Sequence, residues 1–237
     1  MALTTEPRTT RRDRLRAETT REIKSLALAQ LTADGAGAIS LRGIAREMGM
    51  TARAIYSYFA TRDDLVTALV EEINTSLADA LERARDEAAD PGARLFAWGI
   101  ALREWALANP AGFRLVYGDP IPGYRPPVDG PAERAARRVC GGLNRLVAEL
   151  CPDPVEPVGS VEWSHFPADY VAKVRAEAPE ISPAVAALAL RVWGRIHGLV
   201  TLEVYGQLRS VSNDPAALQR ADLLDLVEQL RAQRVAE

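Results

Sequence analysis

The chain has 237 residues, a net charge of −3 and 48% hydrophobic residues, which suffices for one large or two modest domains with buried cores. Its two cysteines, Cys140 and Cys151, cannot build a disulfide framework in a chain of this length. With two histidines and no CxxC pair they do not suggest a zinc site, so we expect no metal and no cofactor. No apolar run reaches the ~20 residues of a membrane span, and the N-terminus lacks the apolar segment of a secretion signal, which indicates a cytoplasmic protein.

Charge is distributed unevenly along the chain. Residues 1–62 contain eleven lysine or arginine residues and six acidic ones, a net charge of +5, so the remainder carries −8. A basic head on an acidic body suits a protein with one end facing a phosphate backbone. Strand patterns are nearly absent, whereas alanine, leucine, arginine and glutamate recur at helical spacing, so the predicted fold class is all-α.

The N-terminal segment, residues 1–14, is polar and rich in threonine and arginine, so we expect it to be disordered. Its arginines suit a basic arm along DNA, but they equally suit a solvated tail, and the composition favours neither. A first helix is expected over residues 15–32 and is broken at Asp34–Gly37. The arginines of the segment are Arg8, Arg11, Arg12 and Arg14.

Two short helices with a tight turn between them are predicted from Ser40 to Arg62. Ser40 stands ahead of the first helix, where its side chain can cap the free amides of the first turn. Gly49 follows that helix, where a left-handed turn favours a residue without a Cβ. The apolar residues of the first helix recur at i, i+3, i+4 and i+7, which is one helix face: Leu41, Ile44, Ala45 and Met48.

The second short helix and the start of a third have equally clear signals. Thr51 is a second N-cap, and Ile55 and Phe59 form an apolar i, i+4 pair. Thr61 with Asp64 three residues later predicts a capping box at the start of a long helix. Helix, glycine turn and short helix together are typical of a helix-turn-helix, although a generic pair of packed helices has similar spacing.

A helix-turn-helix places its second helix in the major groove of DNA. On that helix Arg53 is the candidate for a base edge, and Thr51 and Ala52 can meet thymine methyl groups. Thr51 and the other exposed polar side chains would mostly contact phosphates and set the register. The predicted DNA-binding residues are Ser40, Arg42, Thr51, Ala52, Arg53, Tyr56, Tyr58 and Arg62.

The order of these residues resembles the DNA-binding domain of the TetR family of bacterial repressors. The resemblance covers about residues 17–70, with Arg62 and Tyr58 where the family more often has lysine and histidine. It implies DNA binding by a dimer and a small-molecule pocket in the body. The segments that carry it are Ser40-Leu41-Arg42-Gly43-Ile44-Ala45, Gly49-Met50-Thr51 and Ile55-Tyr56-Ser57-Tyr58-Phe59-Ala60-Thr61-Arg62-Asp63-Asp64-Leu65.

A long helix is expected from Arg62 to about Ala88, roughly 40 Å at 1.5 Å per residue, and to end at Asp90-Pro91-Gly92. We place the domain boundary inside it, near Leu69. Residues 15–68 then form the helix-turn-helix domain, and residues 69–237 form a helical effector-binding and dimerisation domain.

The body is predicted to be helical over residues 93–108, from Pro110, and over 131–150 and 163–177, with proline-rich loops at 118–130 and 151–159. Its aromatic residues suit the lining of a pocket for an apolar or aromatic effector, but they equally suit an ordinary helical core. The candidate pocket residues are Trp98, Trp105, Phe113, Tyr117, Trp163, Trp193 and His197.

Residues 182–208 are apolar on nearly every face, and a last amphipathic helix follows Pro215. A helix that is apolar all round must be buried all round, which suggests a two-fold four-helix interface with a second copy. Residues 192–198 also resemble the Trp-His-Gly type of TetR C-terminal domain. The candidate interface residues are Val192, Ile196, Leu199, Val200, Leu223, Leu226, Val227 and Leu230.

No phosphate-binding loop, dinucleotide fingerprint, HExxH or GxSxG motif is present, so we do not expect an enzyme. The sequence predicts a homodimeric regulator, most simply a repressor, that binds a palindromic DNA operator and is released by a small-molecule effector. The alternative is a helical small-molecule-binding protein or enzyme without sequence-specific DNA binding. Sequence does not separate a repressor from an activator of the same fold.

Overall fold

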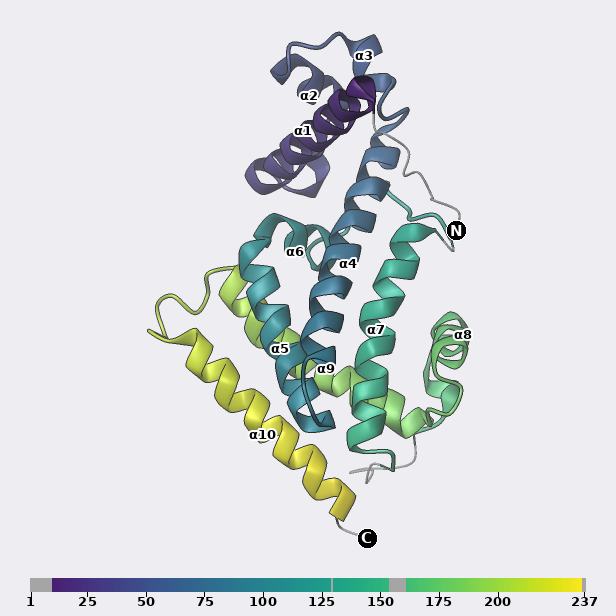
Figure 1. Ribbon diagram of the computed structural model, residues 1–237, viewed down its shortest axis with the longest axis vertical. Coiled ribbons are helices and arrows are strands. Elements are labelled where there is room, and N and C mark those ends of the chain that lie inside the picture. Colours follow the sequence, from purple (N-terminus) through teal and green to yellow (C-terminus); the bar gives the residue numbers. More distant parts are fainter. Residues whose placement is uncertain (1–9, 129, 154–160, 236–237) are drawn as a thin grey trace, which may run out of the picture. The chain divides into compact units, whose positions relative to one another are not determined.

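The computed structural model describes residues 10–128, 130–153 and 161–235, and within them it is all-α, as predicted, without a strand. In the described part of the chain, ten α-helices and two short 3-10 helices follow one another (Figure 1). They are α1 (Arg11–Asp34), η1 (Ala36–Ala38), α2 (Leu41–Glu47), α3 (Ala52–Tyr56), α4 (Arg62–Asp86), α5 (Pro91–Ala108), α6 (Pro110–Tyr117), α7 (Pro131–Leu150), η2 (Trp163–His165), α8 (Ala168–Glu177), α9 (Pro183–Val204) and α10 (Pro215–Val235).

The helices form two compact units. Unit 1 contains the described residues up to Val70 together with Ala111–Pro127, and unit 2 contains Glu71–Pro110 together with the described residues from Val128 onward. Helix α4 therefore passes from one unit into the other. The return of residues 111–127 to unit 1 was not expected, because nothing in their composition ties them to the helix-turn-helix.

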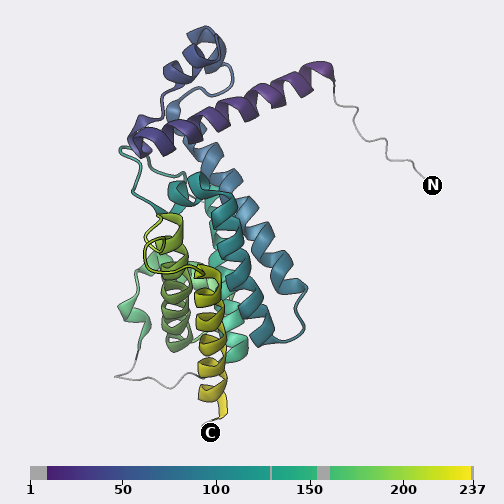
Figure 2. The same cartoon turned by 90° about the vertical axis from the view of Figure 1, so that its left-hand side faces the viewer.

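Unit 1 is built around α1, which Figure 2 shows as one unbroken helix with α2 and α3 on the same side of it. Its core consists of fully buried residues from four helices, so each short helix is fixed by at least one anchor. These residues are Ile23 and Ala27 of α1, Ile44 of α2, Ile55 of α3, and Leu65 and Val66 of α4.

The predicted caps of this unit are confirmed. The Ser40 hydroxyl accepts a hydrogen bond from the Gly43 amide at 3.2 Å, and the Thr51 hydroxyl accepts one from the Ala54 amide at 3.2 Å. At the start of α4, the Asp64 amide donates to the Thr61 hydroxyl at 3.0 Å, and the Thr61 amide donates to the Asp64 carboxylate at 2.9 Å. The turn after α2 passes through Gly49 at φ +65°.

Two helix boundaries differ from the expectation. The first helix begins at Arg11 rather than near Leu15, because Thr10 and Asp13 form a capping box of their own. Asp90 and Pro91 begin α5 instead of merely ending α4, because the Asp90 carboxylate accepts from the Gly92 and Ala93 amides. Proline is favoured at the first helical position, so these residues start α5, whereas α4 already ends at Asp86. The expectations for residues 1–9 and 154–160 lie outside the described residues.

Unit 2 packs α5, α7, α9 and α10 against one another, and in Figure 1 α10 lies beside α5 while α9 crosses behind α5 and α7. The close approach of α5 to α10 occurs at Gly99, whose carbonyl accepts from the buried Gln219 amide at 3.1 Å. A half-buried ion pair, Arg103 with Glu203, joins α5 to α9.

The helix α9 is buried on one face only. By length and composition it would suffice to cross a membrane, contrary to the expectation that no run is long enough. Its buried side packs against α5, α7 and α10, which is how a core helix of a folded domain behaves. Its other side carries the exposed Leu190, Leu202 and Tyr205.

Candidate nucleic-acid interface

The outward face of α3 is the one predicted for DNA reading. Ile55 is fully buried and Phe59 is 8% exposed, and these two anchors turn the opposite face outward. On that face Ala52 and Arg53 are exposed and Tyr56 is 41% exposed. A short helix held by its apolar side and carrying a free arginine has the size and chemistry to enter a major groove.

Ser40 and Thr51 are exposed, and each uses its hydroxyl oxygen to accept from a backbone amide. The hydroxyl hydrogen of each side chain remains a donor, which a phosphate oxygen can accept. Arg42 follows Ser40 in the first turn of α2 and is also exposed. These residues therefore line the ends of α2 and α3, where phosphate contacts set the register.

Tyr58 is half-buried because an arginine of α1 covers it. The Arg16 guanidinium lies 4.7 Å from the Tyr58 ring centroid and donates to the Ser57 carbonyl at 2.8 Å. This cation–π contact and hydrogen bond attach the start of α1 to the end of α3. Arg16 was not a predicted site residue, since it is separated from Tyr58 by 42 positions in the chain.

A basic hollow of 540 Å³ surrounds this contact, and its lining is Arg11, Arg12, Leu15, Arg16 and Tyr58. Two of these arginines belong to the segment expected to be a disordered arm. The Thr10–Asp13 spacing is the signal that could have placed them on a helix, because it is a capping-box pattern. As a result, positive charge is held on a rigid helix beside α3.

The Arg62 side chain is hydrogen-bonded to backbone carbonyls within unit 1. Its guanidinium donates to the Ile39 carbonyl at 3.1 Å and to the Pro122 carbonyl at 3.3 Å, and its side chain is 28% exposed. Nearby, the hydroxyls of Thr67 and Tyr124 are 3.1 Å apart. These bonds attach the loop after α6 to α4. Arg62 therefore stabilises the structure of unit 1, in addition to any contact with phosphate.

The candidate pocket aromatics fall into separate groups. Trp98 lies 6.0 Å from Trp193, which lies 4.7 Å from His197, all ring centroid distances within unit 2. Phe113 and Tyr117, 5.2 Å apart, belong to unit 1. The Trp105 indole donates to Ser76, and Trp163 packs on Phe166. The pocket role of the seven residues stays a prediction.

In the first group Trp98 is buried, whereas Trp193 and His197 are partly exposed. Trp98 is 2% exposed, and burial lowers the pKa of His197 below its ordinary value. The Thr201 hydroxyl lies 3.0 Å from His197 Nδ1. The contact with Thr201 accounts for one ring nitrogen, Nδ1, and the role of His197 in a pocket stays a prediction.

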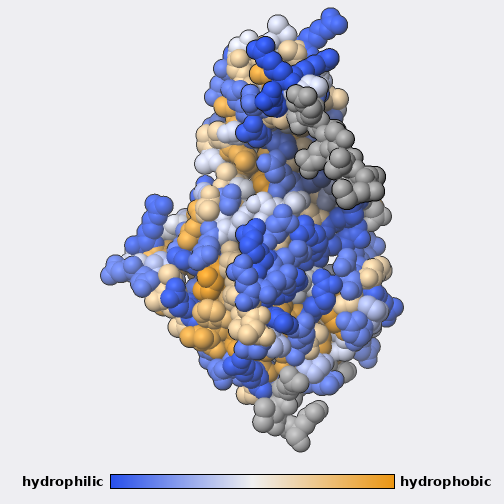
Figure 3. Space-filling view, in the orientation of Figure 1, coloured by the Kyte–Doolittle hydropathy of each residue, from blue (hydrophilic) through white to orange (hydrophobic). Residues whose placement is uncertain are grey.

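The candidate dimer residues are mostly buried within the single chain. Leu199 is partly exposed, but the other seven are 5% exposed or less and form the core between α9, α10 and α5. The outward side of α9 carries a different row of residues, which consists of Leu190, Gly194, Gly198, Leu202 and Tyr205. At Gly194 and Gly198 an added Cβ would meet no atom within 4 Å. Orange residues are also visible over α10 in Figure 3, where Leu218 and Leu224 are about half exposed.

Within the described residues, no group of three or more histidine, cysteine, aspartate or glutamate side chains is arranged to hold a metal ion.

Comparison with known proteins points to one family for both parts of the chain. The description "Bacterial regulatory proteins, tetR family" matches residues 23–69, and "Tetracyclin repressor-like, C-terminal domain" matches residues 95–226. The HTH-type transcriptional regulator Rv1816 of Mycobacterium tuberculosis is 36% identical over 190 residues, which cover 78% of this chain and 80% of the relative. The regulator Mb1846 of Mycobacterium bovis matches to the same extent.

Solved structures give the same result for the fold. The regulatory protein SCO4313 is 32% identical with a TM-score of 0.70, and the match covers 92% of this chain and 100% of that one. A tetR family regulatory protein from Rhodococcus RHA1 has a TM-score of 0.64 over 90% of this chain and 96% of its own, at 18% identity, and so shows the fold alone.

Proposed function

The chain belongs to the tetR family of bacterial regulatory proteins, and we propose that it is a homodimeric repressor that leaves its operator when a small molecule binds. The observation that carries the proposal is the exposed face of α3 with Arg53, flanked by the basic hollow at the start of α1. DNA-binding function fits a cytoplasmic location, and we propose no catalytic activity.

Base reading is assigned to Arg53, whose guanidinium suits the two acceptors of a guanine edge. Thr51 and Ala52 are assigned to thymine methyl groups. Phosphate binding is assigned to Ser40, Arg42, Tyr56 and Tyr58, and we add Arg12 and Arg16, because the arginines at the start of α1 are held next to Tyr58. Arg62 keeps a predicted phosphate role secondary to its bonds within unit 1.

Dimerisation is assigned to the exposed row of α9 rather than to the buried residues on its opposite side. Leu190, Gly194, Gly198, Leu202 and Tyr205 recur at helical spacing and face outward. Small residues in such a row allow two helices to approach closely, and a two-fold axis would pair the row with itself.

A charge in this row tests the assignment. Gly194→Glu should convert the dimer to a monomer in sedimentation velocity at micromolar concentration, because a carboxylate would be buried without a partner. Val128→Glu serves as the control, since Val128 is 88% exposed outside the row. An unchanged dimer in Gly194→Glu, with a normal helical spectrum, would place the interface elsewhere.

The proposed function itself is tested by binding-site selection from random duplex DNA at a stated salt concentration. We expect enrichment of a near-palindrome whose half-sites are about one helical turn apart. The helical carrier or enzyme alternative predicts weak, salt-sensitive binding without any enriched sequence. The position of the enriched site relative to a promoter then separates a repressor from an activator.

Two arginine variants test the division of roles. Arg53→Ala should lower operator affinity by about 1–3 kcal/mol and relax the base preference at one position of each half-site. Arg12→Ala should weaken all sequences alike and reduce the slope of affinity against salt by about one unit per site. Arg220→Ala, an exposed arginine of α10, is the charge-matched control. Identical behaviour of Arg53→Ala and Arg12→Ala would refute the division.

A further inference from the structure

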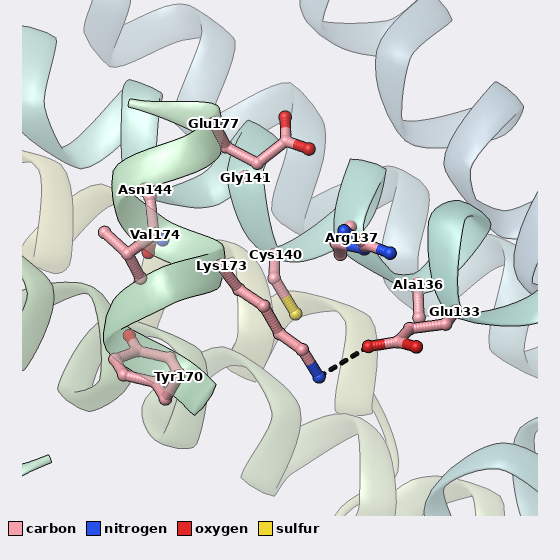
Figure 4. A pocket seen from close by; sticks show the side chains of 10 residues that line it. All are labelled: Glu133, Ala136, Arg137, Cys140, Gly141, Asn144, Tyr170, Lys173, Val174 and Glu177. Atoms are coloured by element: carbon pink, nitrogen blue, oxygen red, sulfur yellow. Dashed lines mark ion pairs between the residues drawn. The ribbon is translucent and has the colours of Figure 1, made fainter. Parts of the chain in front are cut away.

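A cavity of 170 Å³ lies between α7 and α8 of unit 2, and its lining includes none of the aromatic residues predicted to line a pocket. One side is a single face of α7, with residues at i, i+3, i+4, i+7, i+8 and i+11 from Glu133. The other side is a single face of α8, with residues at i, i+3, i+4 and i+7 from Tyr170 (Figure 4). Val174 is the one buried residue of α8. The two helices therefore enclose a cavity between them instead of a packed core.

The cavity has a size that suggests its occupant. An engineered apolar cavity of about 150 Å³ holds a benzene molecule, so 170 Å³ accommodates a single six-membered ring with one small substituent. Ala136, Gly141, Val174 and the Tyr170 ring supply apolar walls for such a ring.

A polar group inside the cavity calls for a hydrogen-bonding substituent. Asn144 lies on the α7 side and is 8% exposed, and no hydrogen bond joins its amide to another described residue. Neither polar atom of this amide is among the fully buried atoms without a partner, so water can reach it, and a ligand that bonds to it would replace that water. The amide both donates and accepts, so a hydroxyl, carbonyl or carboxamide group would suit it.

The charges around the cavity indicate an uncharged ligand. Lys173 and Glu133 form an ion pair of 2.6 Å at one end, marked by the dashed line in Figure 4, and Arg137 and Glu177 add one charge of each sign. The Cys140 sulfur is accessible, but neighbouring side chains desolvate it and raise its pKa; desolvation also raises the pKa of Tyr170. Both groups stay neutral at neutral pH, so no net charge favours an ion.

We propose that the cavity between α7 and α8 is the effector site and that it binds a small uncharged ring compound whose hydroxyl, carbonyl or carboxamide group bonds to Asn144. This inference rests on the proposed ligand-responsive function. A ligand bound there would contact both helices and stabilise the packing of α8 against α7. Four residues lie between the end of α8 at Glu177 and Ser182, which caps α9, the helix assigned to dimerisation. The ligand changes DNA affinity only through its different affinity for the two states of the dimer.

The test uses the full-length protein, with phenol as the probe and benzoate and benzylamine as charged compounds of similar size. The readout is the rate at which methyl methanethiosulfonate modifies Cys140, followed by mass spectrometry, with the buried Cys151 as internal reference. At ten times its dissociation constant, phenol should slow the modification about tenfold, because about nine-tenths of the sites are occupied. No protection by phenol, or equal protection by the charged compounds, would overturn the proposal.

Variants locate the site independently of the thiol. Asn144→Leu should weaken phenol binding about tenfold, the equivalent of one hydrogen bond. Asn74→Leu, at a similarly buried asparagine of α4, should leave the affinity within about twofold. If Asn144→Leu loses its helical spectrum, Val174→Phe fills the cavity from α8 and should abolish protection of Cys140. Normal phenol binding in a folded Asn144→Leu or Val174→Phe protein would refute the assignment.

A final arm separates the two proposals. Phenol at saturation should lower the affinity for the selected operator, and protection of Cys140 without any change in that affinity would overturn the effector role while leaving the binding site in place. Absence of any selected operator would overturn the proposed function, whereas the protection experiment, which contains no DNA, would still decide the cavity.

Discussion

Substitution of Gly99 by alanine tests the packing that holds unit 2 together. A Cβ at this position would lie 2.5 and 2.9 Å from the two Cδ atoms of Leu223 on α10, whereas carbon atoms pack at about 3.5–4.0 Å. Leu223 is fully buried, so it cannot swing into solvent to relieve the overlap. Either its rotamer or the position of α10 must change, at a cost of about 1–3 kcal/mol.

Two further terms adjust this value. A shift of α10 would weaken the 3.1 Å hydrogen bond from the buried Gln219 amide to the Gly99 carbonyl, which contributes about 0.5–1.5 kcal/mol. Alanine in place of glycine inside a helix returns about 1 kcal/mol. The net loss of unfolding free energy for Gly99→Ala is therefore about 0.5–3.5 kcal/mol.

The assay is thermal unfolding at one fixed protomer concentration, because the stability of a dimer depends on concentration. A loss of this size should lower Tm by about 2–4 °C per kcal/mol in a protein of this length. Gly142→Ala is the matched control, since its Cβ would come no closer than 4.0 Å to another side chain and should raise Tm slightly. If Gly99→Ala is as stable as the parent while Gly142→Ala behaves as stated, α10 does not pack on α5 through Leu223.

Three other predictions concern polar groups. Glu203→Gln should destabilise the protein by about 1–3 kcal/mol, because Arg103 is 18% exposed and would keep its charge without a partner; adding Arg103→Met should recover part of the loss in denaturant unfolding. Arg62→Ala should remove two hydrogen bonds at about 0.5–1.5 kcal/mol each and increase the rate of amide hydrogen exchange around Ile39. An unchanged exchange rate would contradict the stabilisation of unit 1 by Arg62. Burial lowers the pKa of His197 below the 6.5 of an unfolded histidine, so its contribution to stability should be complete above about pH 6.5. That contribution should decrease as the pH falls, by at most about 1.4 kcal/mol per pH unit. His197→Gln should flatten this part of the urea-unfolding profile, and an unchanged profile would show that His197 does not cause the pH dependence.

The caps and turn of the helix-turn-helix could be predicted because they depend on neighbours three residues apart. Ser40, Thr51 and Thr61 each bond to an amide three positions later, and Gly49 alone decides a left-handed turn. The same local chemistry fixes which face of α3 turns outward, since Ile55 and Phe59 must be buried. Fold class, most helix boundaries and the surface proposed to read DNA therefore follow from short-range patterns.

Contacts between distant segments were decided only by the tertiary structure. The Arg16–Tyr58 contact, the bond of Arg62 to Pro122 and the return of residues 111–127 to unit 1 join residues that share no local pattern. Apolar composition alone does not say whether a helix face meets its own chain or another, which is why Val192 and its neighbours suggested an interface but form the core of unit 2. Likewise, Asn144 reads as one polar residue on an amphipathic helix, and only the packing of α8 over α7 turns it into a buried amide facing a cavity.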